Sequence, residues 1–337
     1  MPAYIKAISY HLPENVFSND DFFKAFPESI LHRDNYMKIG VKERRIVEKN
    51  ITASDLGIEA GKALFKEHDI KPEEIDFLLF CALEFDYPFP TSASIIQEKL
   101  NIPTTCGATD YNLGCSGFVY GLGMAKGMIE SLGLKNVLLI TSSTLTKTIH
   151  DKDRSSRFVF GDGAAATLIS NRETDEGISS FVFGTDGKMA EKIIIKDGGA
   201  RNPISETSYL ENETENGNIS TNANFYMEGV GVFHFGLKTV PAMVNDLLLK
   251  EQLNIDEIDL FVFHQANLFL INTIRTKLKI SEEKVFNYME LVGNTVSATI
   301  PIALYEAIKA GKAKPGQKIL LAGFGVGLSW SATIIRL

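Results

Sequence analysis

The amino-acid sequence predicts a layered α/β protein made of two copies of one unit. The stretch 75–80 (Ile-Asp-Phe-Leu-Leu-Phe) reads like 258–263 (Ile-Asp-Leu-Phe-Val-Phe), and each copy follows a short acidic turn. The stretch 136–140 pairs in the same way with 318–322, at nearly the same separation along the chain. Continuous apolar runs also alternate with helical patterns, and such runs suit strands that are buried on both faces. Matched features in one order therefore indicate an internal duplication.

The individual elements follow from apolar periodicity. Apolar runs predict buried strands over 77–83, 137–141, 164–170, 261–263 and 331–336, and helical spacing predicts helices over 54–67, 118–131 and 301–309. In the first helix Leu56, Ala60 and Leu64 recur on one face. A polar junction near 171–177 divides the chain into an N-terminal half, 1–172, and a C-terminal half, 173–337. The polar stretch 197–224 is expected to be a long surface loop.

Composition excludes several classes of protein. The chain has 337 residues, 45% of them hydrophobic and 23% charged, which is typical of a soluble globular protein. The net charge of −8 provides no global basic field for nucleic acid or an anionic membrane. The uncharged stretch 319–335 is too short and too rich in Gly and Ser for a membrane span, so two buried strands are expected there. There is no export signal, and three cysteines suit a reducing cytoplasm.

Cys115 is the sharpest candidate for chemistry. It follows a short strand and begins a helical run, and small residues on both sides allow a tight turn that presents the thiol. At a helix N-terminus the dipole is expected to lower the pKa of the thiol. The alternative is a small buried hydrophobic residue. Cys81 and Cys106 are interpreted as structural.

Two polar residues and a glycine-rich turn complete the set. His264 ends a predicted strand, where active-site groups gather in α/β folds, although a structural histidine is the alternative. Asn294 lies four residues before the position equivalent to Cys115 in the second half, and it is either an oxyanion donor or a helix N-cap. The string 323–327 (Gly-Phe-Gly-Val-Gly) lets the backbone approach a ligand. No metal-binding pattern and no dinucleotide-binding fingerprint are present.

These features in this order resemble the condensing enzymes of the thiolase superfamily, above all β-ketoacyl-acyl carrier protein synthase III. The most specific segments are 112–118, 160–165, 264–267, 293–295 and 324–330. The resemblance spans nearly the whole chain. It implies a thiolase-like fold with five layers, α-β-α-β-α, two mixed five-stranded sheets, and a homodimer.

The resemblance also implies roles. Cys115 would take an acyl group from an acyl-coenzyme A or acyl-acyl carrier protein donor. Malonyl-acyl carrier protein would then lose carbon dioxide, while His264 and Asn294 stabilise the enolate. The backbone N–H groups of Cys115 and Val326 would form the oxyanion hole. No cofactor and no metal are implied.

The departures from the family pattern point to a specialised paralogue with a longer or carrier-bound acyl donor. The usual Trp that grips coenzyme A is absent, Lys38 stands near the usual Arg, and Phe269 replaces a basic residue that docks carrier protein. The candidates for docking the acidic carrier are basic side chains: Lys38, Lys42, Arg44, Arg45, Arg275 and Lys277.

Three further residues carry hypotheses from the resemblance. Phe89 or Tyr87 would reach across the dimer and limit the partner's acyl tunnel. Glu84 lies near a position where related enzymes carry a glutamate base, so condensation without decarboxylation is an alternative. The competing interpretation of Glu84 is an exposed loop carboxylate beside Asp86. A catalytically silent acyl-binding homologue is the third hypothesis.

Overall fold

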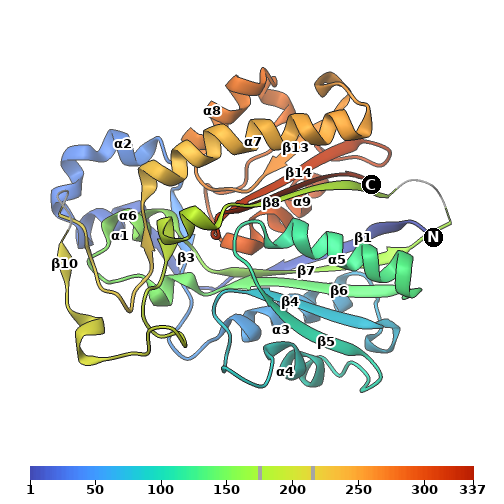
Figure 1. The fold of residues 1–337 in the computed structure, drawn as a ribbon, viewed down its shortest axis with the longest axis horizontal. Helices are drawn as coiled ribbons and strands as arrows, with labels where there is room; N and C mark the ends of the chain where they lie inside the picture. The colour runs from blue at the N-terminus through green and yellow to red at the C-terminus, as the bar shows by residue number, and fades with distance from the viewer. Residues whose placement is uncertain (174–176, 214–216) are drawn as a thin grey trace.

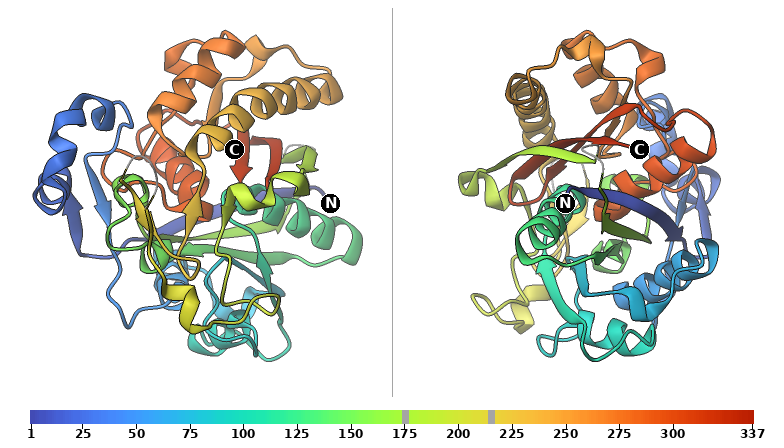
Figure 2. Two further views of the ribbon diagram at one scale, coloured as in Figure 1. Left: turned by 60° about the vertical axis from the view of Figure 1, so that its left-hand side comes forward. Right: turned by 90° about the vertical axis from the view of Figure 1, so that its right-hand side faces the viewer.

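The computed structural model describes residues 1–173, 177–213 and 217–337, and its helices and strands form five layers (Figure 1; Figure 2). The first sheet contains, in spatial order, β1 (Ala3–His11), β7 (Gly163–Asn171), β6 (Asn136–Ser143), β4 (Phe77–Ala82) and β5 (Gly107–Asn112). Strand β4 runs parallel to β5 and β6, whereas β7 is antiparallel to both of its neighbours. All five strands come from the first 171 residues.

The second sheet repeats this arrangement with one strand fewer. Its order is β8 (Ile178–Thr185), β15 (Ser329–Arg336), β14 (Lys318–Gly325) and β13 (Leu260–Phe263). Strand β13 is parallel to β14, and β15 is antiparallel to β14 and β8, so each strand matches one of the first sheet. The structure therefore has the duplicated mixed-sheet architecture that the internal repeat predicts.

The prediction of two five-stranded sheets is wrong for the second sheet. The segment that would match β5 makes a single bridge, between Val285 and Phe261, where the Phe286 N–H donates to the Phe261 carbonyl at 3.1 Å. Two residues later, the Tyr288 N–H donates to the side chain of Gln265 at 2.8 Å. Because a side chain takes this backbone donor, the segment leaves the edge of the sheet after one bridge.

Helices fill the other three layers. Helices α3 (Ala53–Glu67) and α4 (Ser92–Lys99) cover the outside of the first sheet, and α7 (Gly229–Glu251) and α8 (Leu268–Leu278) lie on the outside of the second. Helices α5 (Gly117–Leu132) and α9 (Thr299–Lys309) form the middle layer (Figure 1). The three predicted helices are confirmed, with ends one or two residues longer.

The middle layer holds the two halves together through apolar contact. One buried cluster combines Phe118 and Leu122 of α5 with Ile300 and Leu304 of α9, and it includes strand residues from both sheets. Burying such side chains contributes about 1.5–3 kcal/mol each relative to exposure. The turns that begin α5 and α9 are thereby fixed next to each other.

The shorter elements surround one end of the two sheets. They are β2 (Val16–Ser18), α1 (Asn19–Ala25), α2 (Arg33–Met37), β3 (Glu43–Arg45), α6 (Arg154–Val159), β9 (Ile193–Ile194), β10 (Asn212–Glu213), β11 (Ile219–Ser220) and β12 (Tyr226–Met227). The described parts of the predicted loop 197–224 contain the hairpin of β10 and β11, and residues 214–216 lie outside the described residues, as do 174–176 of the predicted junction. In the described part of the chain, no helix has both the length and the apolar character needed to cross a membrane.

A fully buried arginine anchors the N-terminal elements. The guanidinium of Arg44 donates to the carbonyls of Phe17 and Phe158 and to the Asn19 side chain at 3.0 Å. It also lies 4.7 Å from the centre of the Phe158 ring. Burial lowers the pKa of Arg44 to about 10, so the group stays charged at neutral pH.

We predict that Arg44→Met lowers the free energy of unfolding by about 3 kcal/mol, because two buried acceptors and one partly buried acceptor lose their donor. Urea denaturation followed by circular dichroism measures the change. Lys38→Met removes an exposed cation from the same region and serves as the matched control. Equal stability of the two variants would show that the Arg44 hydrogen bonds contribute nothing net.

Candidate active site

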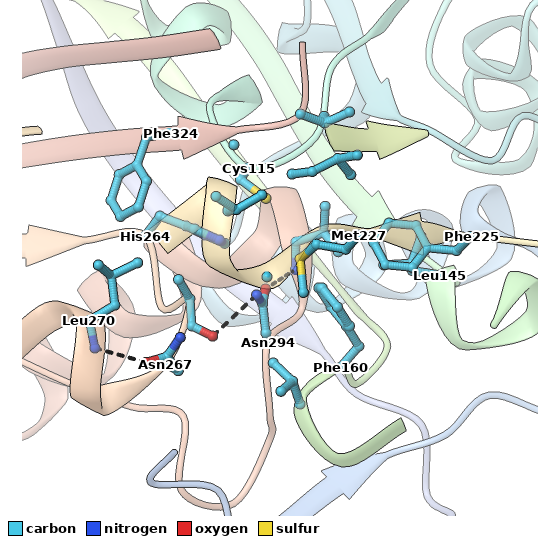
Figure 3. Close-up of a pocket in the computed structure, with 18 of the residues that line it drawn as sticks. Cys115, Leu145, Phe160, Phe225, Met227, His264, Asn267, Leu270, Asn294 and Phe324 are labelled. Carbon is cyan, nitrogen blue, oxygen red and sulfur yellow. Dashed lines mark hydrogen bonds between the residues drawn. The ribbon is translucent and has the colours of Figure 1, made fainter. Parts of the chain in front are cut away.

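A cavity of about 140 Å³ lies where the two halves meet, and the structure brings Cys115, His264 and Asn294 together on its wall. Cys115 comes from the turn between β5 and α5, His264 directly follows β13, and Asn294 precedes α9. Figure 3 shows the three side chains directed toward the same space. The rest of the wall is mainly apolar and includes Leu83, Leu145, Phe160, Ile193, Phe225, Met227, Phe233, Leu270, Phe324 and Val326.

Two glycines of β14 make room for the Cys115 turn. A Cβ atom on Gly325 would lie 2.7 Å from the Cys115 Sγ, and one on Gly323 would lie 2.8 Å from the Cys115 carbonyl oxygen. Any other residue would push the turn away from the strand. The glycine-rich string thus serves the close approach of the N-terminal half to the C-terminal half, rather than the approach of a ligand alone.

The prediction that the helix dipole lowers the pKa of the Cys115 thiol is wrong. Burial raises this pKa to about 12, although the backbone N–H groups of Val326 and Cys115 itself face the thiol and favour its charged form. The thiol is accessible from the cavity, but protein atoms enclose it and keep bulk water away. Desolvation therefore outweighs the two N–H groups that face the thiol.

His264 is held as a neutral ring. Its backbone N–H donates to the Ala322 carbonyl at 2.8 Å, and its ring meets the Phe324 ring edge-on, with 5.6 Å between centres. Its Nδ1 lies 2.7 Å from the hydroxyl of Thr299. Burial lowers the pKa of His264 to about 3, so the imidazole carries no charge at neutral pH.

The amide of Asn294 has a fixed orientation. Its Oδ1 accepts the Val296 N–H at 2.9 Å, and only an oxygen can accept there. The Nδ2 group therefore points the other way, where one of its protons approaches the Ala266 carbonyl at 3.5 Å. The remaining proton is available to an oxygen in the cavity.

The backbone of Val296 connects the two polar groups. Its N–H holds Asn294, and its carbonyl accepts the Thr299 hydroxyl at 3.0 Å, which in turn contacts His264. Val296 adopts a left-handed conformation, with φ of 53°, which is strained for a β-branched residue.

The sequence matches two family profiles: 3-oxoacyl-[acyl-carrier-protein (ACP)] synthase III over residues 109–187, and the C-terminal part of 3-oxoacyl-[acyl-carrier-protein (ACP)] synthase III over residues 248–337. The chain is 35% identical to the β-ketoacyl-[acyl-carrier-protein] synthase III of Caldanaerobacter subterraneus over 97% of this chain and 95% of that protein. The synthase III of Fusobacterium nucleatum is also 35% identical, over 98% of both chains. A crystal structure of a 3-oxoacyl-(acyl-carrier-protein) synthase III matches with a TM-score of 0.96, at 42% identity over the full length of both chains.

The chain belongs to the β-ketoacyl-acyl carrier protein synthase III family. This membership confirms the resemblance drawn from the motifs, and the two-sheet architecture is the thiolase-like fold of that family.

Other predicted site residues lie elsewhere. Glu84 is not among the residues that line this cavity, and its carboxylate is not exposed beside Asp86 as the competing interpretation expected. Its carboxylate is buried, accepts the Thr144 N–H at 3.3 Å, and has one oxygen without a hydrogen-bond partner. Burial raises its pKa to about 7. Phe89 and Tyr87 lie at the surface, with 86% and 58% of their areas exposed.

The predicted docking cations differ in burial and in their partners. The prediction that Arg44 docks the carrier is wrong, because its side chain is fully buried. Arg275 donates to the Ile280 carbonyl at 3.1 Å and pairs with Glu282 at 3.9 Å. Lys277 donates to the Leu237 carbonyl at 2.9 Å, and Lys38 lies exposed beside Asn35. Lys42 pairs with Glu290, and Arg45 donates to the carbonyls of Pro13 and Glu14.

Sequence reasoning missed Thr299 and Phe160. Thr299 lies one helical turn after Val296, and a hydroxyl at that spacing from a candidate Asn is a weak signal. Phe160 begins the quoted segment 160–165, but nothing local shows which way its ring points. The contacts of both residues depend on the meeting of distant segments.

We predict that alkylation of Cys115 by iodoacetamide rises about tenfold per pH unit between pH 7 and 10. A thiol with a pKa near 12 has roughly a thousandfold smaller thiolate fraction at pH 8 than a solvated thiol, and the thiolate is the reacting form. Intact mass at timed intervals gives the rate, and Cys115→Ala corrects for Cys106. A plateau below pH 9 would mean that the thiolate forms far more readily than burial allows.

Proposed function

We propose that this protein condenses an acyl thioester with malonyl-acyl carrier protein, with loss of carbon dioxide, to give a β-ketoacyl product. The observation that carries the proposal is the convergence of Cys115, His264 and Asn294 on one apolar cavity, with two backbone N–H groups at the thiol. The named relatives are β-ketoacyl-acyl carrier protein synthases, which is the same reaction class.

The first half-reaction transfers the acyl group to Cys115. The sulfur attacks the thioester carbonyl, and the N–H groups of Cys115 and Val326 stabilise the developing oxyanion. A thiol with a raised pKa must lose its proton as it attacks, so a base is needed. Neutral His264 can accept that proton at Nε2 and return it to the departing thiolate. The free thiol leaves, and an acyl-Cys115 thioester remains.

The second half-reaction forms the carbon–carbon bond. The bond between the malonyl carboxylate and the methylene carbon breaks, carbon dioxide leaves, and the electron pair forms an enolate. His264 and Asn294 donate to the enolate oxygen, each contributing about 3–4 kcal/mol. The enolate carbon attacks the acyl carbonyl, the bond to Cys115 breaks, and the departing thiolate takes up one proton, which is supplied by solvent water.

Thr299 sets which proton His264 presents. Its hydroxyl has one proton and two acceptors, the Val296 carbonyl and His264 Nδ1. When Thr299 donates to Val296, Nδ1 carries the ring proton and Nε2 is free to accept from the thiol. When Thr299 donates to Nδ1, Nε2 carries the proton and can donate to the enolate. We therefore assign Thr299 a positioning role in both half-reactions.

The two alternatives have less support. Glu84 as a base for condensation without decarboxylation is disfavoured because its carboxylate is absent from the cavity wall and hydrogen-bonds Thr144. A catalytically silent acyl-binding protein would not need an oriented Asn294 amide or glycines packed against Cys115, and this protein has both.

The partners follow from the same proposal. The acyl donor is a coenzyme A or carrier-protein thioester. We interpret the missing Trp and the presence of Phe269 as signs that this protein is a specialised paralogue. We propose a homodimer, because exposed Phe89 and Tyr87 lie on one loop beside β5, an edge strand open to pairing. Exposed Lys38 and the last turn of α8, with Arg275 and Lys277, are proposed to dock the carrier in the cytoplasm.

We predict that incubation with acyl thioesters adds one acyl group to the wild-type protein and none to Cys115→Ala, as measured by intact mass. His264→Ala should reduce carbon dioxide release from malonyl thioester by about two to three orders of magnitude. Acylation that persists in Cys115→Ala would refute the nucleophile.

Glu84→Gln separates the decarboxylating reaction from its alternative. It removes the ionisable group and keeps the shape, so carbon dioxide release should stay within a few-fold of wild type. Condensation that proceeds without a malonyl group and disappears in Glu84→Gln would establish the alternative instead.

We predict that Thr299→Val reduces the kcat of decarboxylation about 10- to 100-fold with little change in KM, as expected for loss of a group that orients a functional histidine. Thr299→Ser, which keeps the hydroxyl, should retain most activity. Nitrogen-15 NMR of His264 reads the tautomer directly and separates this role from a structural one. An unchanged tautomer and rate in Thr299→Val contradict the assignment.

A further inference from the structure

Phe160 lines both the active-site cavity and a second cavity. The first has a volume of about 140 Å³ and the second about 120 Å³. Its ring is buried and packs edge-on against Phe225, with 5.3 Å between ring centres. In Figure 3, Phe160 and Phe225 lie on the side of the active-site cavity away from His264.

The second cavity is suited to hydrocarbon. Apolar side chains make up most of its wall: Val16, Phe17, Ile46, Ile149 and Phe160. Of the three polar residues on this wall, Asn15 is exposed at the surface, and the side chains of Arg157 and Thr146 have partners within the protein. Arg157 donates to Asp151 at 2.8 Å, and the Thr146 hydroxyl donates to Asp162. The space therefore needs no polar ligand.

The outer end of this cavity reaches the surface. Val16 is 39% exposed, and Asn15 beside it is also exposed. A chain that passed the Phe160 ring would thus have room to extend rather than meet a closed core.

Two backbone hydrogen bonds hold the main chain on either side of Phe160. Asn294 donates its N–H to the Val159 carbonyl at 2.9 Å, and Gly161 donates to the Asn294 carbonyl at 3.1 Å. A shift of the main chain would have to break these bonds, whereas a turn of the Phe160 ring would leave them intact. The ring is therefore the part of this wall that we expect to move.

We infer that the second cavity is a binding subsite for the distal end of long saturated acyl chains, and that the Phe160 ring is its gate. This inference rests on the proposed function, because it concerns the acyl group carried by Cys115. It names a chain-length determinant within the protomer, distinct from Phe89 and Tyr87. Short acyl groups remain on the Cys115 side of the ring, whereas long ones must displace it.

The test compares the rates at which butanoyl-, octanoyl- and dodecanoyl-coenzyme A acylate Cys115, measured by intact mass. Phe160→Ala should raise the ratio of dodecanoyl to butanoyl rates at least about tenfold. Burying even one additional methylene group in an apolar pocket changes the relative rates of two substrates by about that factor. Phe160→Leu gives the same direction with a smaller change, if the alanine variant folds poorly.

Two control variants distinguish a gate from added volume. Phe225→Ala adds a similar volume to the first cavity and leaves the Phe160 ring in place, so it should raise the ratio clearly less than Phe160→Ala, even though Phe160 loses one packing contact. Val16→Trp fills the outer end of the second cavity, so it should cancel the gain in the Phe160→Ala background and leave butanoyl transfer unchanged.

The inference is overturned if Phe160→Ala and Phe225→Ala give equal gains, if Val16→Trp leaves the gain intact, or if neither Phe160 variant changes the ratio. The rate of butanoyl transfer tells a failure of this inference from a failure of the proposed function, because it does not depend on the second cavity. If wild-type Cys115 accepts no acyl group from any of the three donors, the proposed function itself fails.

Discussion

The left-handed backbone of Val296 is the constraint on which the polar site depends. One peptide unit orients the Asn294 amide through its N–H, and the same residue's carbonyl holds the hydroxyl that contacts His264. A β-branched residue adopts this conformation only where its surroundings enforce it. Here Val296 is 2% exposed and packs into the core of the C-terminal half, while Asn294 is tied to the segment before the first half's β7. The strain is thus held by packing from both copies of the unit.

The site that results contains no permanent charge of its own. His264 has a pKa near 3 and the Cys115 thiol a pKa near 12, so both are neutral over the physiological range. Loss of carbon dioxide moves negative charge from a carboxylate onto an enolate oxygen. Neutral donors in a dry cavity stabilise charge where it develops without fixing an ion there beforehand. A fixed imidazolium, by contrast, would hold the substrate carboxylate and oppose its departure.

The sequence was sufficient where structure and chemistry are local or repeated. The duplicated α/β unit follows from matched apolar runs, and the convergence of Cys115, His264 and Asn294 follows from their places after strands or before helices. The sequence was insufficient where contacts between distant segments decide whether a side chain is buried, what its pKa is, or where a strand ends. Arg44 looks like a surface cation, but one of its partners, Phe158, lies 114 residues away. Likewise, burial decides the pKa of Cys115, and the side chain of Gln265 ends the fifth strand after one bridge. None of these partners can be read from the neighbouring residues.

The bridge between Phe160 and Asn294 has a consequence for how the family can diversify. The backbone of Asn294, whose amide faces the cavity, is hydrogen-bonded to the residues on either side of Phe160, Val159 and Gly161. A shift of the main chain that reshaped the wall would also move the amide. At this point of the wall, a new cavity shape is therefore expected to arise by exchange of the side chain at position 160 while the backbone stays in place. Such a wall can be altered one mutation at a time, and each intermediate keeps its polar groups aligned.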